Sequence, residues 1–247
     1  MKKYLLIGPL ALLAGWALLS QLKLIDPFFL PGPLATLAEL KKLFFSGTIW
    51  PDIFSTLERV LLSFAIAVII GLPLGLLIGR SEKLYRSVEF IIDFFRSTPA
   101  TALFPLFLLI FGITDKSKIA AAAFAAMLII IFNTAYGVMH AQKSRLLAAK
   151  IMGASPGQIF RWILFWESLS QTFTGLRSAV SITLVVIIIT EMFIGTTSGL
   201  GKLIIDSQMT YEIKTMYAAI IIVGTIGYLL NLLFMIAEKK FLHWNGR

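Results

Sequence analysis

A few ionisable and hydroxyl side chains interrupt the apolar stretches of this sequence, and they have the greatest chemical capacity. Six of them are candidates for lining or gating a path through the protein, namely Arg96, Ser97, Thr98, Thr101, Asn133 and Glu191. An ionisable group among apolar residues is costly, and it usually faces protein, water or an interface. These side chains can therefore form hydrogen bonds and ion pairs.

Each candidate also has a purely structural interpretation. Asp93 and Arg96 are three residues apart, so on a helix they are neighbours and can pair. Their position towards the cytoplasmic end of an apolar stretch favours a structural or gating role over contact with a solute. Glu191 can be a carboxylate that snorkels to the outer interface, or it can bind a group of the outer loop. Asn133 can hydrogen-bond across packed helices.

Sequence signatures of an enzyme are missing. There is no G-x-x-x-x-G-K-[ST] phosphate-binding loop, no H-E-x-x-H zinc motif and no G-x-S-x-G nucleophile motif. Cysteine is absent, and the two histidines, His140 and His243, are isolated from each other. We therefore expect no catalytic residue, no metal site and no cofactor in this chain.

Composition places the protein in a membrane. Of its 247 residues, 58% are hydrophobic and 14% are charged, which is too apolar a mixture for one soluble core. Five uncharged runs have close to the roughly 20 residues that a helix needs to cross a bilayer; they are 4–22, 60–79, 97–114, 119–142 and 215–237. A sixth apolar stretch, 172–194, carries Arg177 and Glu191. Because a backbone in lipid must satisfy its own hydrogen bonds, we expect an all-α integral membrane protein of about six transmembrane helices.

The distribution of Lys and Arg sets the expected orientation. With the N-terminus inside, the segments on the cytoplasmic side carry twelve of these residues and those on the other side carry seven. The positive-inside rule then places both termini in the cytoplasm of a multi-pass plasma (inner) membrane protein. It also explains the net charge of +9 without nucleic acid as a partner. The 19-residue first apolar run exceeds the usual length in a signal peptide, which favours a retained membrane helix.

Three glycines recur at every fourth residue of the second expected helix: Gly71, Gly75 and Gly79. This spacing places them on one face of the helix. Small residues on one face let another helix approach closely. We interpret them as helix-packing residues with no direct role in transport.

The stretch SRLLAAKIMGASPGQIFRWILFW, residues 144–166, predicts two short helices joined by a sharp turn. Gly153 suits the left-handed conformation that ends a helix. Ser155 and Gln158 then have the spacing of a capping box, with Pro156 at the first helical position. Local chemistry alone leaves a helical connecting loop as an alternative. A surface for docking is favoured by small side chains at Ala148, Ala149, Gly153 and Ala154.

The same stretch resembles a motif of ABC importer permeases. LAAKIMGASPGQIFRWILFW is similar to their cytoplasmic E-A-A-x-x-x-G sequence, with matching positions at Ala148, Ala149, Gly153 and Ile163. Leu147 stands where the family usually has Glu, and Trp166 stands where it usually has Pro. Other segments, including FFRSTPATALFPLFLLIFGI and GLRSAVSITLVVIIITEMFIGTTSGLGKLI, resemble the nitrate/sulfonate/taurine branch in the same order. Together they cover nearly all of residues 30–240.

The resemblance implies a type I ABC importer permease fold with a cytoplasmic coupling helix. It implies one transmembrane domain over residues 1–247, with an N-terminal membrane helix at 1–25 and a core bundle at 53–240. In that family two permease chains form the path, an extracytoplasmic binding protein delivers solute, and each coupling helix docks on one of two ATP-binding subunits. ATP and Mg would bind to those subunits. Contact with them is expected from Leu147, Ala148, Ala149, Gly153, Ala154 and Ser155.

The expected function is therefore that of a permease subunit in an ATP-driven importer. The solute would be a small molecule such as nitrate, a sulfonate, taurine or a vitamin precursor. Which of these it is, and whether the partner permease is a second copy in a homodimer or another chain, stays open. An ion-coupled secondary transporter is the alternative, but it predicts inverted repeats and ionisable residues at the midplane. The sequence has no convincing internal repeat, and its clearest charges lie near the ends of spans.

Overall fold

The structure is a computed structural model that describes residues 7–193 and 195–242. Every regular element among these residues is helical, so the all-α prediction is confirmed. The α-helices are α1 (Ile7–Gln21), α2 (Pro33–Ser46), α3 (Trp50–Gly79), α4 (Glu82–Ser97), α5 (Phe104–Phe111), α6 (Asp115–Met139), α7 (Lys143–Ile151), α8 (Pro156–Ile159), α9 (Phe165–Glu191), α10 (Leu200–Met209) and α11 (Ile213–Phe241). A 3₁₀ turn (Ala100–Leu103) precedes α5, and a π-helical turn (Phe160–Leu164) joins α8 to α9.

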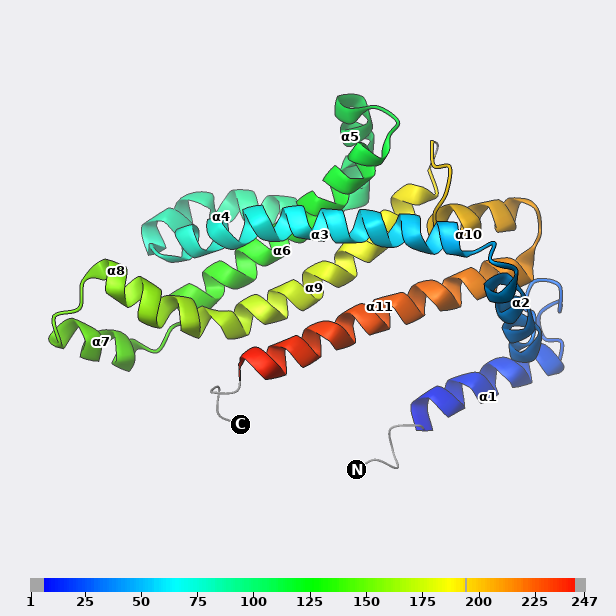
Figure 1. Ribbon diagram of the computed structural model, residues 1–247, viewed down its shortest axis with the longest axis horizontal. Coiled ribbons are helices and arrows are strands. Elements are labelled where there is room, and N and C mark those ends of the chain that lie inside the picture. The colour runs from blue at the N-terminus through cyan, green and yellow to red at the C-terminus, as the bar shows by residue number, and fades with distance from the viewer. Residues whose placement is uncertain (1–6, 194, 243–247) are drawn as a thin grey trace.

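Helices α3, α6 and α9 form the centre of the bundle, with α6 packed against both of the others (Figure 1). The buried face of α6 is rich in alanine and includes Ala121, Ala122, Ala126 and Ala135, all without exposed surface. In a membrane, small residues drive helix association because they bring backbones close together. The side chains of α11 are mostly not buried and are largely apolar, as expected for contact with lipid.

The glycine stripe of α3 is buried and faces α6: Gly71, Gly75 and Gly79. A methyl group on Gly75 would lie 2.7 Å from Cβ of Thr134 and 2.9 Å from the carbonyl oxygen of Ile131. These distances are too short for carbon, and a backbone carbonyl cannot move aside as a flexible side chain can. The spacing of α3 and α6 therefore depends on glycine.

The third apolar stretch does not form one straight helix. α4 and the segment from the 3₁₀ turn through α5 meet at 90°. Pro99 has no N–H to donate, and it disfavours a helical conformation at Thr98. Thr98 is accordingly extended, with φ −82° and ψ 123°. The expected span over residues 97–114 is thus a 3₁₀ turn and a short apolar helix, joined through the bend to α4.

The spans otherwise follow the apolar runs. Four helical segments are long and apolar enough to cross a membrane: α3, α6, the continuous run Pro156–Glu191 and α11. The bent pair supplies a fifth if its two halves form one span. α1 is apolar and shorter, with 15 residues, and the ring of its Trp16 stacks 6.0 Å from the ring of Tyr217 in α11. The expected six spans become four long helices, a bent pair and this shorter helix.

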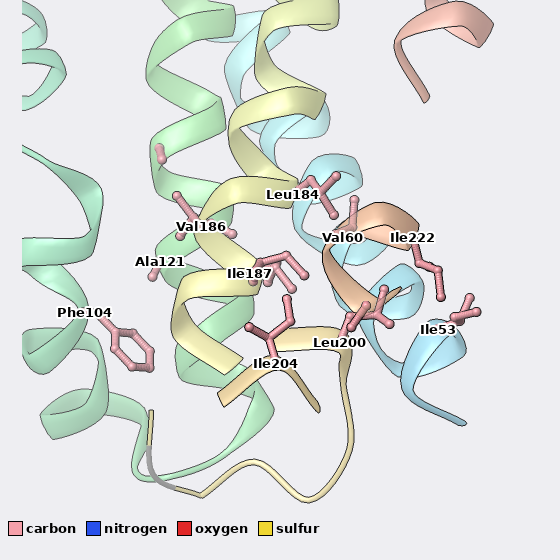
Figure 2. Close-up of a cluster of buried hydrophobic side chains, with 14 of the residues drawn as sticks. Ile53, Val60, Phe104, Ala121, Leu184, Val186, Ile187, Leu200, Ile204 and Ile222 are labelled. Atoms are coloured by element: carbon pink, nitrogen blue, oxygen red, sulfur yellow. The ribbon is translucent and has the colours of Figure 1, made fainter. Parts of the chain in front are cut away.

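Helices α2 and α10 lie at the opposite end of the molecule from α7 and α8 (Figure 1). An apolar cluster ties α10 to the central helices. Figure 2 shows four of its members, Val60 from α3, Ile187 from α9, and Leu200 and Ile204 from α10. α10 is therefore held against α3 and α9.

Candidate functional sites

Residues 143–159, from α7 through α8, form a bent helical segment at one end of the molecule (Figure 1). We call this segment the knee. Gly153 has φ 77°, and its N–H donates to the carbonyl oxygen of Lys150 at 3.0 Å. The N–H of Ala154 donates to the carbonyl oxygen of Ala149, also at 3.0 Å. These two bonds and the left-handed glycine make up a Schellman ending of α7.

The second half of the knee starts a long helix. Ser155 and Gln158 form the capping box that their spacing predicts. The chain then continues through α8 and the π-helical turn into α9, giving one helical run of 36 residues. π-helical turns are single-turn insertions that are frequent at functional sites. Trp166, in place of the usual Pro, lies just after this turn and is 42% exposed.

The knee exposes an apolar ridge. Leu147, Ile151 and Met152 are 61%, 78% and 86% exposed. Of the other predicted contact residues, Ala148, Gly153 and Ser155 are exposed, and Ala149 and Ala154 are half-buried. Within residues 143–161 the charged residues are all basic: Lys143, Arg145, Lys150 and Arg161. An apolar ridge of this kind indicates contact with another protein.

Glu167 of α9 fastens the start of the knee to the bundle. Its carboxylate accepts hydrogen bonds from the backbone N–H of Gln142 and from the guanidinium of Arg145, the latter at 3.0 Å. A carboxylate beside the first turn of α7 also interacts favourably with the helix dipole. Sequence reasoning missed Glu167. The available signal was a single acidic residue between a basic segment and an apolar span.

Arg96, Ser97, Thr98 and Thr101 lie together at the bend between α4 and α5. Nη1 of Arg96 is 3.1 Å from Oδ1 of Asp93, so the predicted pair is present. The guanidinium also lies over the ring of Phe132, with its carbon 3.8 Å from the ring centroid. Phe132 is seven residues, or about 10 Å, from the end of α6. Arg96 therefore lies about two helical turns from that end of α6.

The bend residues continue a charged face of α4. This face has spacings of four, three, four and three residues and consists of Glu82, Arg86, Glu89, Asp93 and Arg96, all exposed. A second exposed face is apolar and contains Phe90, Ile91 and Phe94. Ile92 is buried against the bundle. Charged side chains on a membrane helix require water or protein beside them, so the charged face needs a partner other than lipid.

Asn133 points towards α9. Its side-chain amide donates to the carbonyl oxygen of Ile129 at 2.9 Å, within α6. A methyl group on Gly175 of α9 would lie 2.6 Å from Cβ of Asn133. Asn133 therefore occupies the contact between these two helices.

Glu191 lies in a buried ion cluster near the end of α9. Its carboxylate accepts a hydrogen bond from Arg59 at 2.6 Å and another from the backbone N–H of Gly201 at 2.9 Å. The hydroxyl of Thr56 lies 2.9 Å and 3.0 Å from its two oxygens. Arg59 also bonds Asp115 at 3.0 Å. The interpretation of Glu191 as a snorkelling carboxylate is wrong, because the loop before α10 folds over it and leaves it no exposed surface.

The cluster also fixes the Gly-Leu-Gly turn that starts α10. Arg59 donates to the carbonyl oxygen of Ser198 at 2.7 Å, and the N–H of Gly199 donates to Asp52 at 2.8 Å. Gly199 has φ 147°, and any side chain there would collide with the Glu191 carboxyl group. In the sequence, Arg59 is only the charged residue that precedes the uncharged run 60–79. Its partners are 56 and 132 residues away, so no local spacing could reveal them.

Comparison with known proteins identifies the family. Residues 71–243 match the family described as binding-protein-dependent transport system inner membrane component. The chain belongs to this family. The knee, the bend and the ion cluster are accordingly features of an inner-membrane permease.

Two relatives support this assignment, and one solved structure shows the same fold. The permease is 30% identical to the taurine transport system permease protein TauC of Escherichia coli, over 97% of this chain and 89% of that protein. It is 31% identical to the nitrate import permease protein NrtB of a Synechocystis strain, over 73% of this chain and 65% of that protein. An inward-facing structure of the MetNI methionine ABC transporter has a TM-score of 0.67 at 22% identity, over 77% of this chain and 94% of that one. The predicted fold and the predicted role as an ABC importer permease are confirmed.

Proposed function

We propose that this permease forms the membrane path of an importer for a small anion, and that the knee couples the path to a partner ATPase. The observation that carries the proposal is the apolar ridge of Leu147, Ile151 and Met152, exposed at one end of the bundle. The ridge lies in the segment that resembles the coupling motif. Its basic surround favours a groove in the ATPase with an apolar floor and an acidic rim.

The helical run Pro156–Glu191 supports a mechanical link between this groove and the far end of the bundle. Its 36 residues correspond to a length of about 54 Å if the run is straight. Glu167 attaches the start of α7 to the same run, so both helices of the knee move with α9. ATP binding and hydrolysis in the partner would then favour one arrangement of the helices over another. This chain itself makes and breaks no covalent bond.

The charged face of α4 supports a path on that side of the bundle. Lipid cannot cover Glu89, Asp93 and Arg96 without a large cost, whereas water in a path can. The face leads to the bend, where the polar side chains of Arg96, Thr98 and Thr101 are exposed or half-buried. We infer that the bend borders the path and that α5 helps to gate it.

The assembly and the solute follow from the family resemblance and the relatives. We infer two copies of this chain, two ATPase subunits that bind ATP and Mg, and an extracytoplasmic binding protein. Twelve basic residues on one side against seven on the other favour cytoplasmic termini. The relatives named for taurine and nitrate transport favour a small solute that carries an anionic group.

Affinity purification of the chain from its native membranes in mild detergent tests the proposal. We expect an ATPase with a phosphate-binding loop to co-purify, and we expect uptake by reconstituted vesicles to require ATP. A chain that repeatedly purifies alone, and that transports solute without ATP, would contradict the proposal. That result would favour an ion-coupled secondary transporter.

A further inference from the structure

A cavity of about 360 Å³ lies at the bend between α4 and α5. It is bounded by the end of α4, the 3₁₀ turn, α6 and one residue of α9. Its walls include Phe95, Arg96, Thr98, Phe124, Leu128 and Ile182. The volume falls within the range of about 300–1,000 Å³ that is typical of small-molecule sites. The bend creates this space, because a straight helix would continue α4 across the bundle.

Among the described residues that form its walls, the cavity has one cation and no carboxylate; the carboxylate of Asp93 lies outside the walls and is bonded to that cation. Arg96 supplies the cation, and the aromatic and aliphatic side chains of Phe95, Phe124, Leu128 and Ile182 supply most of the rest. The hydroxyl of Thr98 donates to the carbonyl oxygen of Phe94 at 2.9 Å, so its hydrogen is already used. Recognition of charge in the cavity therefore depends on Arg96.

Arg96 is held in place before any ligand arrives. One face of its guanidinium lies on Phe132, and Nη1 bonds Asp93. Among the described residues, its other nitrogens have no hydrogen-bond partner, although a guanidinium carries five N–H donors. Its side chain is 36% exposed. The remaining donors are therefore available to the two oxygens of an anionic head group.

We propose that this cavity is a transient solute site selective for organic monoanions with an apolar body, such as alkyl or aryl sulfonates and carboxylates. The head group would bind Arg96, and the body would contact Phe95, Phe124 and Leu128. Nitrate would leave these apolar walls without a partner. This inference rests on the proposed function, because it places the site beside the path.

The test uses the permease–ATPase complex in nanodiscs, with para-fluorobenzenesulfonate as the probe and fluorine NMR line width as the measure of binding. Arg96→Met removes the charge, and we expect the dissociation constant to rise at least about tenfold. Arg96→Lys keeps the charge but loses the paired donors, so we expect a smaller rise. Ala100→Leu fills the cavity without changing a charge, and it should also weaken binding. Arg80→Met, at an exposed arginine after α3, is the matched control and should bind as the unmodified chain does.

Competition and lipid composition complete the test. Benzenesulfonate should displace the probe at concentrations at which nitrate does not. Displacement by both alike would overturn the proposed selectivity, and unchanged binding by Arg96→Met would overturn the site. Binding that is present in phosphatidylcholine nanodiscs but lost in phosphatidylglycerol nanodiscs would assign Arg96 to a lipid head group, and this too would overturn the proposal.

Two controls separate this proposal from the proposed function. ATPase co-purification and ATP-driven uptake test the function, and neither requires the probe. A complex that passes both but binds the probe independently of Arg96 and Ala100 refutes only the cavity site. A chain that recruits no ATPase refutes the proposed function. In that case, probe binding to the permease alone still tests whether the cavity is a solute site. If Arg96→Met does not fold, Ala100→Leu and Arg96→Lys provide the same comparison.

Discussion

Replacement of Gly153 is the sharpest test of the knee. Gly153 has φ 77°, a conformation that glycine adopts freely and that costs an L-residue about 1–2 kcal/mol. No atom lies within 4 Å of the position of its missing Cβ, so a new side chain meets no neighbour. The full cost of Gly153→Ala is therefore backbone strain at the end of α7. Gly153→Val adds the restriction of a β-branched side chain and should cost more.

This strain should appear as weaker binding of the ATPase. Since a tenfold change corresponds to about 1.4 kcal/mol, Gly153→Ala should raise the dissociation constant about 5- to 30-fold. Gly153→Asn should keep most of the affinity, because asparagine tolerates the left-handed conformation. Gly157→Ala is the matched control. Gly157 also has open space at Cβ but lies within α8 without a positive φ, so alanine is favourable there.

The assay is a titration of the purified ATPase against the permease in nanodiscs, with thermal unfolding of the permease measured in parallel. The unfolding midpoint should change little, because the knee projects from the bundle. Equal ATPase binding by Gly153→Val and the unmodified chain would refute the reasoning. A loss of binding by Gly157→Ala as large as that by Gly153→Val would refute it too, since strain at the left-handed position would not be the cause.

Three further substitutions test the packing of α3 on α6, the ion cluster around Glu191, and the attachment of the knee to α9 through Glu167. Gly75→Ala should destabilise the bundle by about 1–3 kcal/mol through overpacking against α6. Gly15→Ala is the control and should not destabilise it, because the space at its Cβ is open. Unchanged thermal stability of Gly75→Ala would contradict the close packing of α3 on α6. Glu191→Ala leaves Arg59 without one buried partner and should lower the free energy of unfolding by about 3–5 kcal/mol. Proteolysis before α10 should become faster. A free energy of unfolding within about 1 kcal/mol of the unmodified chain, which is the value for exposed ion pairs, would contradict the role of Glu191. Glu167→Gln should preserve ATPase binding but reduce solute-stimulated ATP hydrolysis. Full stimulation would show that the attachment of the knee through Glu167 is dispensable.

Local sequence predicted most of the long apolar helices and the turn of the knee. The apolar runs predicted the long spans because a backbone in lipid must form its own hydrogen bonds. Gly153 and Ser155 predicted the turn of the knee because their effects act within a few residues of the chain. The resemblance of this stretch to the coupling motif then indicated an ABC importer permease. The division of the chain stays a prediction: a membrane helix at residues 1–25, a core bundle at 53–240, and a single domain over 1–247.

Tertiary structure alone decided how separate segments meet. The partners of Glu191 come from α3 and the start of α10, so its complete burial could not be read from its neighbours in sequence. The sharpness of the bend depends on Pro99 and on how α5 packs against α6, and an apolar run by itself cannot distinguish a straight helix from two crossed ones. Hydropathy is a property of each residue, whereas an ion cluster or a cavity exists only when distant segments are brought into contact.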